Sequence, residues 1–200
     1  MPKPKAVYII GGAGSGKSSL MGNFLKHLGA KLGPLEDLHV KPNKKNDVTL
    51  RGSRYSSNFG PGLYLGLMRE EHPGTDGLDR ASTPTAVEWL ELGDLLGGLP
   101  NIISEGNVLA TKPFFKKLST SHDLLVVHLL VSDEERLQRL KARGTNQKST
   151  FVAGTVTRGK NMARFAEECG AKVLEVDTES TGYTEETCEY MTDHLTGGAR

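Results

Sequence analysis

The sequence predicts an α/β domain of three layers, with helices on both faces of a mostly parallel central sheet. Segments typical of strands alternate along the chain with segments of helical periodicity, which is the pattern of parallel strands joined by crossover helices. Residues 124–131 form a nearly continuous apolar run, so a strand there must be covered on both faces. A chain of 200 residues with 36% hydrophobic residues can bury one core, and we expect a single domain over residues 1–200.

Each expected element has its own local signal. Apolar segments bounded by polar residues predict strands over 5–10, 101–104, 124–131 and 172–176. Apolar periodicity predicts helices over 17–28, 84–96, 113–118, 133–143, 158–169 and 185–195. Thr83 followed by Pro84 is expected to cap the second helix, and Ser132 with Glu135 forms a capping box before the fourth.

Residues 31–82 are the least regular part of the chain. Short strands are expected there at 38–40, 48–51 and 63–67, the last two forming a hairpin. A long irregular segment inside a compact domain usually carries function. We therefore expect residues 31–82 to form the acceptor side of a site, meaning the side that binds the molecule to which a group is transferred. A second irregular stretch, polar and rich in Gly and Thr, is expected over 145–157.

A glycine-rich motif, G-x-x-x-x-G-K-S, follows the first expected strand directly and leads into the first helix. Successive backbone N–H groups must turn toward a phosphate in such a loop, and a Cβ atom would block the approach. The start of the helix adds unpaired N–H donors and the positive end of its dipole. Lys17 can reach the β- and γ-phosphates and Ser18 can ligate Mg²⁺, which predicts a nucleoside triphosphate and Mg²⁺ as cofactors. The residues expected to hold the nucleotide are Gly11, Gly12, Ala13, Gly14, Ser15, Gly16, Lys17, Ser18 and Ser19.

The chain as a whole is nearly neutral, but its acidic and basic residues are unevenly distributed along the sequence. The net charge of +1 gives no overall reason to expect binding to nucleic acid or to a membrane. Residues 136–164, however, contain eight basic residues and no Asp or Glu. Since the nearest anion is the triphosphate, we expect this region to act as a lid in which Arg139 and Arg143, on one helix face, stabilise the transferring phosphoryl group. A solvated helix face is the alternative, and Arg136 is less favoured because it falls in the first turn.

Glu105 follows the expected strand over 101–104. Ligands bind outside the carboxyl ends of parallel strands, which places this carboxylate near the glycine-rich loop. Glu105 could hold Mg²⁺ together with Ser18, or accept the proton of an attacking hydroxyl. Capping of the next segment is the alternative role.

Location is indicated only by weak signals. The two cysteines, Cys169 and Cys188, have neither disulfide nor metal spacing, which favours a reducing compartment. No signal-peptide pattern and no apolar stretch long enough for a bilayer are present. We therefore expect a cytoplasmic protein without a membrane partner.

The glycine-rich loop, the Glu-Gly after an apolar strand and the arginine helix together resemble the P-loop nucleoside and nucleotide kinases. Residues 74–82 and 147–155 further resemble blocks of the bacteriophage 5-hydroxymethyluracil DNA kinases. This resemblance implies an ATP-dependent, Mg²⁺-assisted transfer of the γ-phosphate to the hydroxymethyl group of a modified pyrimidine in phage DNA. If the chain is encoded by a phage, the expected location is the host cytoplasm. Two alternatives stay open: a kinase of a free nucleoside, nucleotide or other small metabolite, and a P-loop ATPase or switch without an acceptor.

The resemblance also implies roles on the acceptor side. Asp76 would be the general base, with an Asx turn in Gly-Thr-Asp-Gly as the alternative. Asp79 and Arg80 resemble the Asp-Arg pairs near the acceptor of nucleoside kinases, with a surface ion pair as the alternative. Arg54 and Tyr55, from a stretch where aromatic and basic residues alternate, are expected to bind an extruded base unless they fill the core beneath a hairpin.

Overall fold

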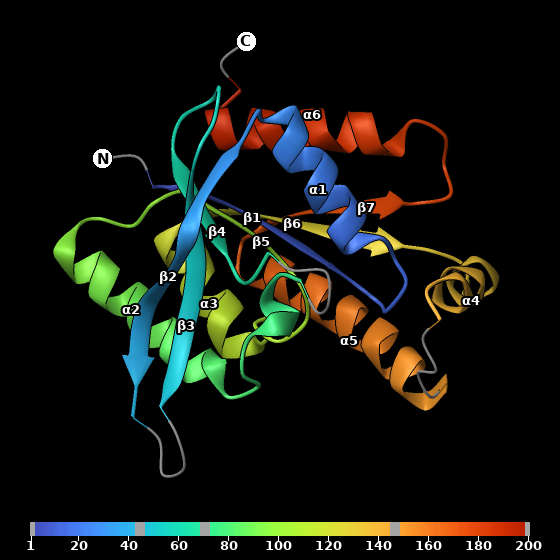
Figure 1. Ribbon diagram of the computed structural model, residues 1–200, viewed down its shortest axis with the longest axis horizontal. Coiled ribbons are helices and arrows are strands. Elements are labelled where there is room, and N and C mark those ends of the chain that lie inside the picture. Colours follow the sequence, from blue (N-terminus) through green and yellow to red (C-terminus); the bar gives the residue numbers. More distant parts are fainter. Residues whose placement is uncertain (1–2, 43–46, 69–72, 145–148, 199–200) are drawn as a thin grey trace.

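The computed structural model describes residues 3–42, 47–68, 73–144 and 149–198. The strands of this part of the chain form one sheet in the order β2-β3-β4-β5-β1-β6-β7 (Figure 1). Pairing is parallel from β4 to β7 and antiparallel between β2 and β3 and between β3 and β4. The strands are β1 (Lys5–Gly11), β2 (Lys31–Lys41), β3 (Val48–Ser56), β4 (Gly62–Leu65), β5 (Ile102–Glu105), β6 (Asp123–Leu130) and β7 (Lys172–Asp177).

Helices cover both faces of this sheet, which confirms the three-layer α/β fold (Figure 1). One core lies between the sheet and α1 and α6, and the other between the sheet and α2, α3 and α5. The helices are α1 (Lys17–His27), α2 (Ser82–Leu96), α3 (Lys112–Ser121), α4 (Asp133–Ala142), α5 (Ser149–Glu168) and α6 (Tyr183–Thr196), with a single 3₁₀ turn, η1 (Thr75–Gly77). None of the helices in the described ranges has the length and apolar character needed to cross a membrane.

Residues 31–82 contain longer strands than the sequence predicted. β2 and β3 pair along their lengths and, through β4, extend the parallel sheet at one edge. The expected hairpin is present between β3 and β4, but β2 is much longer than the strand expected at 38–40. β2 was missed because it is an edge strand that contains Gly33 and Pro34 and pairs with two register shifts, so it lacks a clean alternation of apolar and polar residues.

Two helix starts also differ from the prediction. Thr83 does not cap α2: the helix begins at Ser82 after Ala81, and the Thr83 hydroxyl instead lies 3.3 Å from that of Thr111. α5 begins at Ser149, so the loop expected over 145–157 is helical in its described part. The capping box of α4 is confirmed, since the Ser132 hydroxyl accepts a hydrogen bond from the backbone N–H of Glu135.

Candidate active site

The glycine-rich loop joins β1 to α1 as expected. Gly11 is the last residue of β1, and Lys17 is the first of α1. Gly14 and Gly16 have φ angles of 78° and 92°, a region that residues with a Cβ rarely adopt. These two positions turn the loop into the start of the helix, where free backbone N–H groups favour an anion.

Lys17 is folded back under this loop. Its Nζ atom donates hydrogen bonds to the carbonyl oxygens of Gly11 and Gly12, both at 3.1 Å. Burial lowers the pKa of Lys17, while the negative charges of Asp76 and Glu105 oppose that shift. The ammonium group and the two carboxylates therefore act on one another within a single site.

Glu105 ends β5 beside Ile9 of β1, and its side chain is buried. Burial raises the pKa of this carboxyl to about 7, against the opposing effects of the Lys17 charge and of a hydrogen bond with the Ser18 hydroxyl. The Oε1 atom has no hydrogen-bond partner in the described part of the structure. A buried carboxylate oxygen with free acceptor capacity, next to a serine hydroxyl, is a donor set that fits Mg²⁺.

Asp76 is brought to the same end of the sheet by η1. The Thr75 hydroxyl lies 3.0 Å from the Tyr8 hydroxyl of β1, which ties the turn to the core. Asp76 Oδ1 accepts hydrogen bonds from the backbone N–H groups of Asn107 at 2.5 Å and Val108 at 3.2 Å. These contacts hold the Asp76 carboxylate beside the residues that follow Glu105.

The arginines of α4 occupy three different environments. Arg143 is exposed, and its charge acts on both Lys17 and Glu105. Arg139 is held by Glu135 (Nε to Oε1, 2.8 Å) and by the hydroxyl and carbonyl oxygens of Thr178. Arg136, which was less favoured, is almost fully buried with its side chain against Gly14 and pairs with Asp133.

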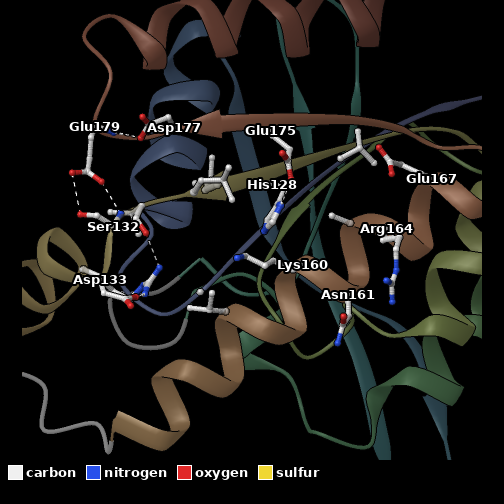
Figure 2. A pocket seen from close by; sticks show the side chains of 18 residues that line it. His128, Ser132, Asp133, Lys160, Asn161, Arg164, Glu167, Glu175, Asp177 and Glu179 are labelled. Atoms are coloured by element: carbon white, nitrogen blue, oxygen red, sulfur yellow. Dashed lines mark hydrogen bonds and ion pairs between the residues drawn. The ribbon is translucent and has the colours of Figure 1, made fainter.

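Two cavities adjoin the loop. The smaller one, of about 330 Å³, lies at the start of α1 and is lined by Gly16, Ser19, Arg139, Ala142, Arg143 and Tyr183. The larger one, of about 1050 Å³, lies between α5 and the strands β6 and β7 and includes Gly12 of the loop. Figure 2 shows polar and apolar side chains around it, with His128 bonded to Glu175 (3.2 Å) and Ser132 bonded to Glu179. The smaller cavity lies beside the loop and Arg143, whereas several carboxylates around the larger one are engaged by neighbouring side chains.

The structure separates two of the expected acceptor residues from this site. Tyr55 is opposite Gly62 at the start of β4, whereas the loop and Glu105 lie where parallel strands end. Its side chain is 5% exposed and packs in the core, while Arg54 pairs with Glu36. The prediction assumed an irregular segment, and the antiparallel direction of β3 places these residues at the opposite end of the sheet.

Asp79 and Arg80 lie on the exposed chain between η1 and α2. Asp79 Oδ1 accepts a hydrogen bond from the backbone N–H of Ala81 at 2.7 Å, which is the geometry of a local turn. They follow Asp76 by three and four positions, so they lie close to the site along the chain, and their role at an acceptor stays a prediction.

Sequence reasoning missed two residues near the site. Arg158 of α5 donates a hydrogen bond to the carbonyl oxygen of Ala110 at 3.1 Å, and its positive charge opposes the rise that burial causes in the pKa of Tyr8. Tyr183 lines the smaller cavity. Each lies far along the chain from the glycine-rich loop, and no local sequence pattern predicts that it lies near the site.

Several solved structures are similar to the chain. They include shikimate kinase from Acinetobacter baumannii in complex with shikimate (TM-score 0.48, 14% identity, 98% of this chain and 95% of that chain). Deoxyadenosine kinase from M. mycoides with the products dCMP and dCDP has a TM-score of 0.45 and 16% identity over 96% of this chain and 98% of that chain. A sugar kinase from Janibacter sp. HTCC2649 has a TM-score of 0.44 and 13% identity over 98% and 99% of the two chains.

No curated protein matches the sequence. The model of the family described as P-loop Nucleotide Kinase3 matches residues 3–188, which include the glycine-rich loop, η1, Glu105 and the arginine helix. Because this match spans nearly the whole chain, the protein belongs to the P-loop nucleotide kinases and is a phosphotransferase.

Proposed function

We propose that this kinase transfers the γ-phosphate of ATP to a hydroxyl group, and that the acceptor is the 5-hydroxymethyl group of hydroxymethyluracil in DNA. One observation carries the proposal. The two segments that resemble the phage DNA kinases, 74–82 and 147–155, both reach the P-loop site in their described parts. The first supplies Asp76 beside Glu105, and the second supplies Thr155, which bonds to Ala13 of the loop.

The loop and its helix would bind the triphosphate of ATP. The backbone N–H groups of Lys17 and Ser18, in the first turn of α1, would donate to the phosphates, and the smaller cavity beside Ser19 and Tyr183 would receive the nucleoside. Lys17 would leave the carbonyl oxygens of Gly11 and Gly12 and donate to the β- and γ-phosphates instead. Ser18 and Glu105 would hold Mg²⁺, which when bound neutralises charge on the phosphates.

Asp76 would act on the acceptor. It would take the proton of the attacking hydroxyl while that oxygen forms a bond to the γ-phosphorus and the bond from phosphorus to the oxygen of ADP breaks. The two backbone N–H groups on Oδ1 support this role, because they fix the carboxylate without neutralising it. Arg143 and Arg139 would stabilise the charge on the transferring phosphoryl group.

A free nucleoside or nucleotide is the second candidate acceptor. The balanced net charge of +1 favours it, since proteins that hold DNA mainly through phosphate contacts carry an excess of basic residues on the binding face. The basic residues of 136–164 and the two family-like segments favour DNA.

Transfer of labelled phosphate tests the proposal. The enzyme is incubated with Mg²⁺ and γ-labelled ATP in the presence of duplex DNA containing hydroxymethyluracil, of the same duplex with thymine, or of free nucleosides and nucleotides. We expect label only in the hydroxymethyluracil duplex, and none with Lys17→Ala. Label only in free nucleosides or nucleotides would replace the DNA acceptor by the second candidate. Release of inorganic phosphate without any labelled acceptor would show an ATPase.

A further inference from the structure

A hydrogen bond joins the P-loop to α5, a helix that is not part of the strand–loop–helix motif that binds phosphate. The backbone N–H of Ala13 donates a hydrogen bond to Thr155 Oγ1 of α5 at 2.9 Å. The Thr155 hydroxyl donates its own proton to the carbonyl oxygen of Val152, one turn earlier, at 2.7 Å. Because the proton is committed to Val152, the oxygen is left to accept from Ala13. The hydroxyl thus forms a directed bridge from the backbone of α5 to the loop.

The same face of α5 packs against the neighbouring loop residues. A Cβ atom at Gly12 would lie 2.8 Å from Cγ2 of Val156, so this glycine allows the loop to touch the helix. A Cβ atom at Gly159 would lie 3.6 Å from Cα of Gly11. Gly159 lies four residues after Thr155 and three after Val156, so these three residues share one face of α5 and form one stripe. Met162, Ala163 and Ala166 continue that stripe into the hydrophobic core.

The loop is therefore supported from outside at its first turn. Ala13 donates outward to Thr155, while Lys17 and the free N–H groups at the start of α1 lie beyond Gly16. A loop that is already held in its binding conformation loses less conformational entropy when the triphosphate binds. Thr155 is almost fully buried, so loss of its hydroxyl would leave the backbone N–H of Ala13 without this hydrogen-bond partner.

We infer that Thr155 is a positioning residue for nucleotide binding: its hydroxyl holds the first turn of the P-loop in the conformation that receives the triphosphate. Thr155 acts through Ala13 and not on a reacting atom. The inference rests on nucleotide binding at the P-loop and is independent of which acceptor the proposed function assigns.

Matched substitutions separate the hydroxyl from the packing. Thr155→Val keeps the branched shape and removes the acceptor, whereas Thr155→Ser keeps the acceptor and removes a methyl group. We expect Thr155→Val to raise the Kd for ATP with Mg²⁺ by about three- to tenfold, the range that one neutral hydrogen bond contributes. Thr155→Ser should restore the Kd to within about twofold of the wild type. Thr157→Val is the control, because Thr157 is exposed on the same helix and bonds only to the Ala153 carbonyl oxygen among the contacts of the described residues.

Calorimetric titration without acceptor gives the Kd, and hydrogen exchange of the loop amides reports on the bond itself. Exchange at Ala13 should be faster in Thr155→Val than in the wild type and in Thr155→Ser. Equal Kd values for the wild type and Thr155→Val would overturn the inference, as would an equal loss in the Ser and Val variants, which would show a packing role. A wild-type protein that bound no nucleotide would overturn the proposed function as well, whereas failure to label hydroxymethyluracil DNA would leave the inference standing.

Discussion

The carboxylate of Asp76 accepts a hydrogen bond from the backbone N–H of Asn107, with Oδ1 2.5 Å from the nitrogen. This contact joins η1 to the residues that follow β5, the strand that ends in Glu105. The Oδ1 atom therefore has a structural role, and a catalytic role for the carboxylate must be tested separately from it.

Asp76→Asn makes this separation, because the amide keeps an Oδ1 acceptor and loses the charge. We expect kcat to fall by about 10²-fold or more, the usual contribution of a general base, while the Kd for ATP and the melting temperature stay close to the wild type. Steady-state kinetics and calorimetric titration provide these values. Retention of kcat in the variant would leave Asp76 with the structural role alone.

The raised pKa of Glu105 predicts a link between pH and Mg²⁺. Mg²⁺ binds the ionised carboxylate, so at limiting Mg²⁺ the rate should rise as pH increases through about 7. Saturating Mg²⁺ favours the ionised form and should move the midpoint of the pH profile to lower pH. Rate profiles at several Mg²⁺ concentrations test this, and a midpoint that does not respond to Mg²⁺ would contradict a ligand role for Glu105.

The same group predicts a pH dependence of stability. The folded protein holds the Glu105 proton with a pKa of about 7, against 4.5 as the ordinary value, so it binds more protons than the unfolded chain between these pH values. The free energy of unfolding should therefore decrease as pH rises from about 4.5 to about 7. In the wild type this decrease in unfolding free energy should be on the order of 2 kcal/mol over the interval. Glu105→Gln has no group that titrates there, so the decrease should be absent when urea unfolding is measured at each pH. Parallel curves for the two proteins would refute the expectation.

Substitution of Gly74 should destabilise the protein, and substitution of Gly97 provides the control. A Cβ atom at Gly74 would lie 2.4 Å from the carbonyl oxygen of Glu105, and the residue has a φ of 66°. Gly97 has a similar φ of 69° but a ψ of 25°, against −144° at Gly74, and it has open space around its Cβ position, so only Gly74 adds both an unfavourable ψ and a close contact. Gly97→Ala should cost about 1 kcal/mol of unfolding free energy from backbone strain alone, and Gly74→Ala at least about 2 kcal/mol more. Equal costs would show that the contact between η1 and β5 is loose.

Arg143 and Arg139 should respond differently to substitution. Arg143 is exposed, lines the smaller cavity and acts on the site through its charge, so Arg143→Ala should lower kcat by roughly 10²-fold with little change in melting temperature. Arg139 is bonded to Glu135 and Thr178, so Arg139→Ala should lower both kcat and the melting temperature. Arg164→Ala, at an exposed position on α5, is the control. An unchanged kcat in Arg143→Ala would favour the solvated helix face.

The strongest local patterns predicted the parts of the fold that they cover. The loop from Gly11 to Ser18, the capping box at Ser132 and the apolar run of β6 are each recognisable within about ten residues, because their geometry is imposed by backbone hydrogen bonding and by burial on both faces. β2 escaped prediction because an exposed edge strand with register shifts needs no regular alternation of apolar residues.

The position of site residues depended on strand direction. Glu105 was placed correctly beside the P-loop because β5 and β1 are parallel neighbours whose carboxyl ends meet. Arg54 and Tyr55 were placed wrongly because β3 runs antiparallel to β4, which carries them to the other end of the sheet. No feature of a single segment shows which neighbour it will pair with, or in which direction.

The sequence by itself determined the three-layer α/β fold and the P-loop motif, which predicts a nucleoside triphosphate as ligand, since both follow from local backbone chemistry and apolar periodicity. Only the tertiary structure decided that Asp76 meets the end of β5 and that Thr155 supports Ala13. These contacts join residues that are about 30 and 140 positions apart, and they exist because sheet order and helix packing bring distant segments to one edge.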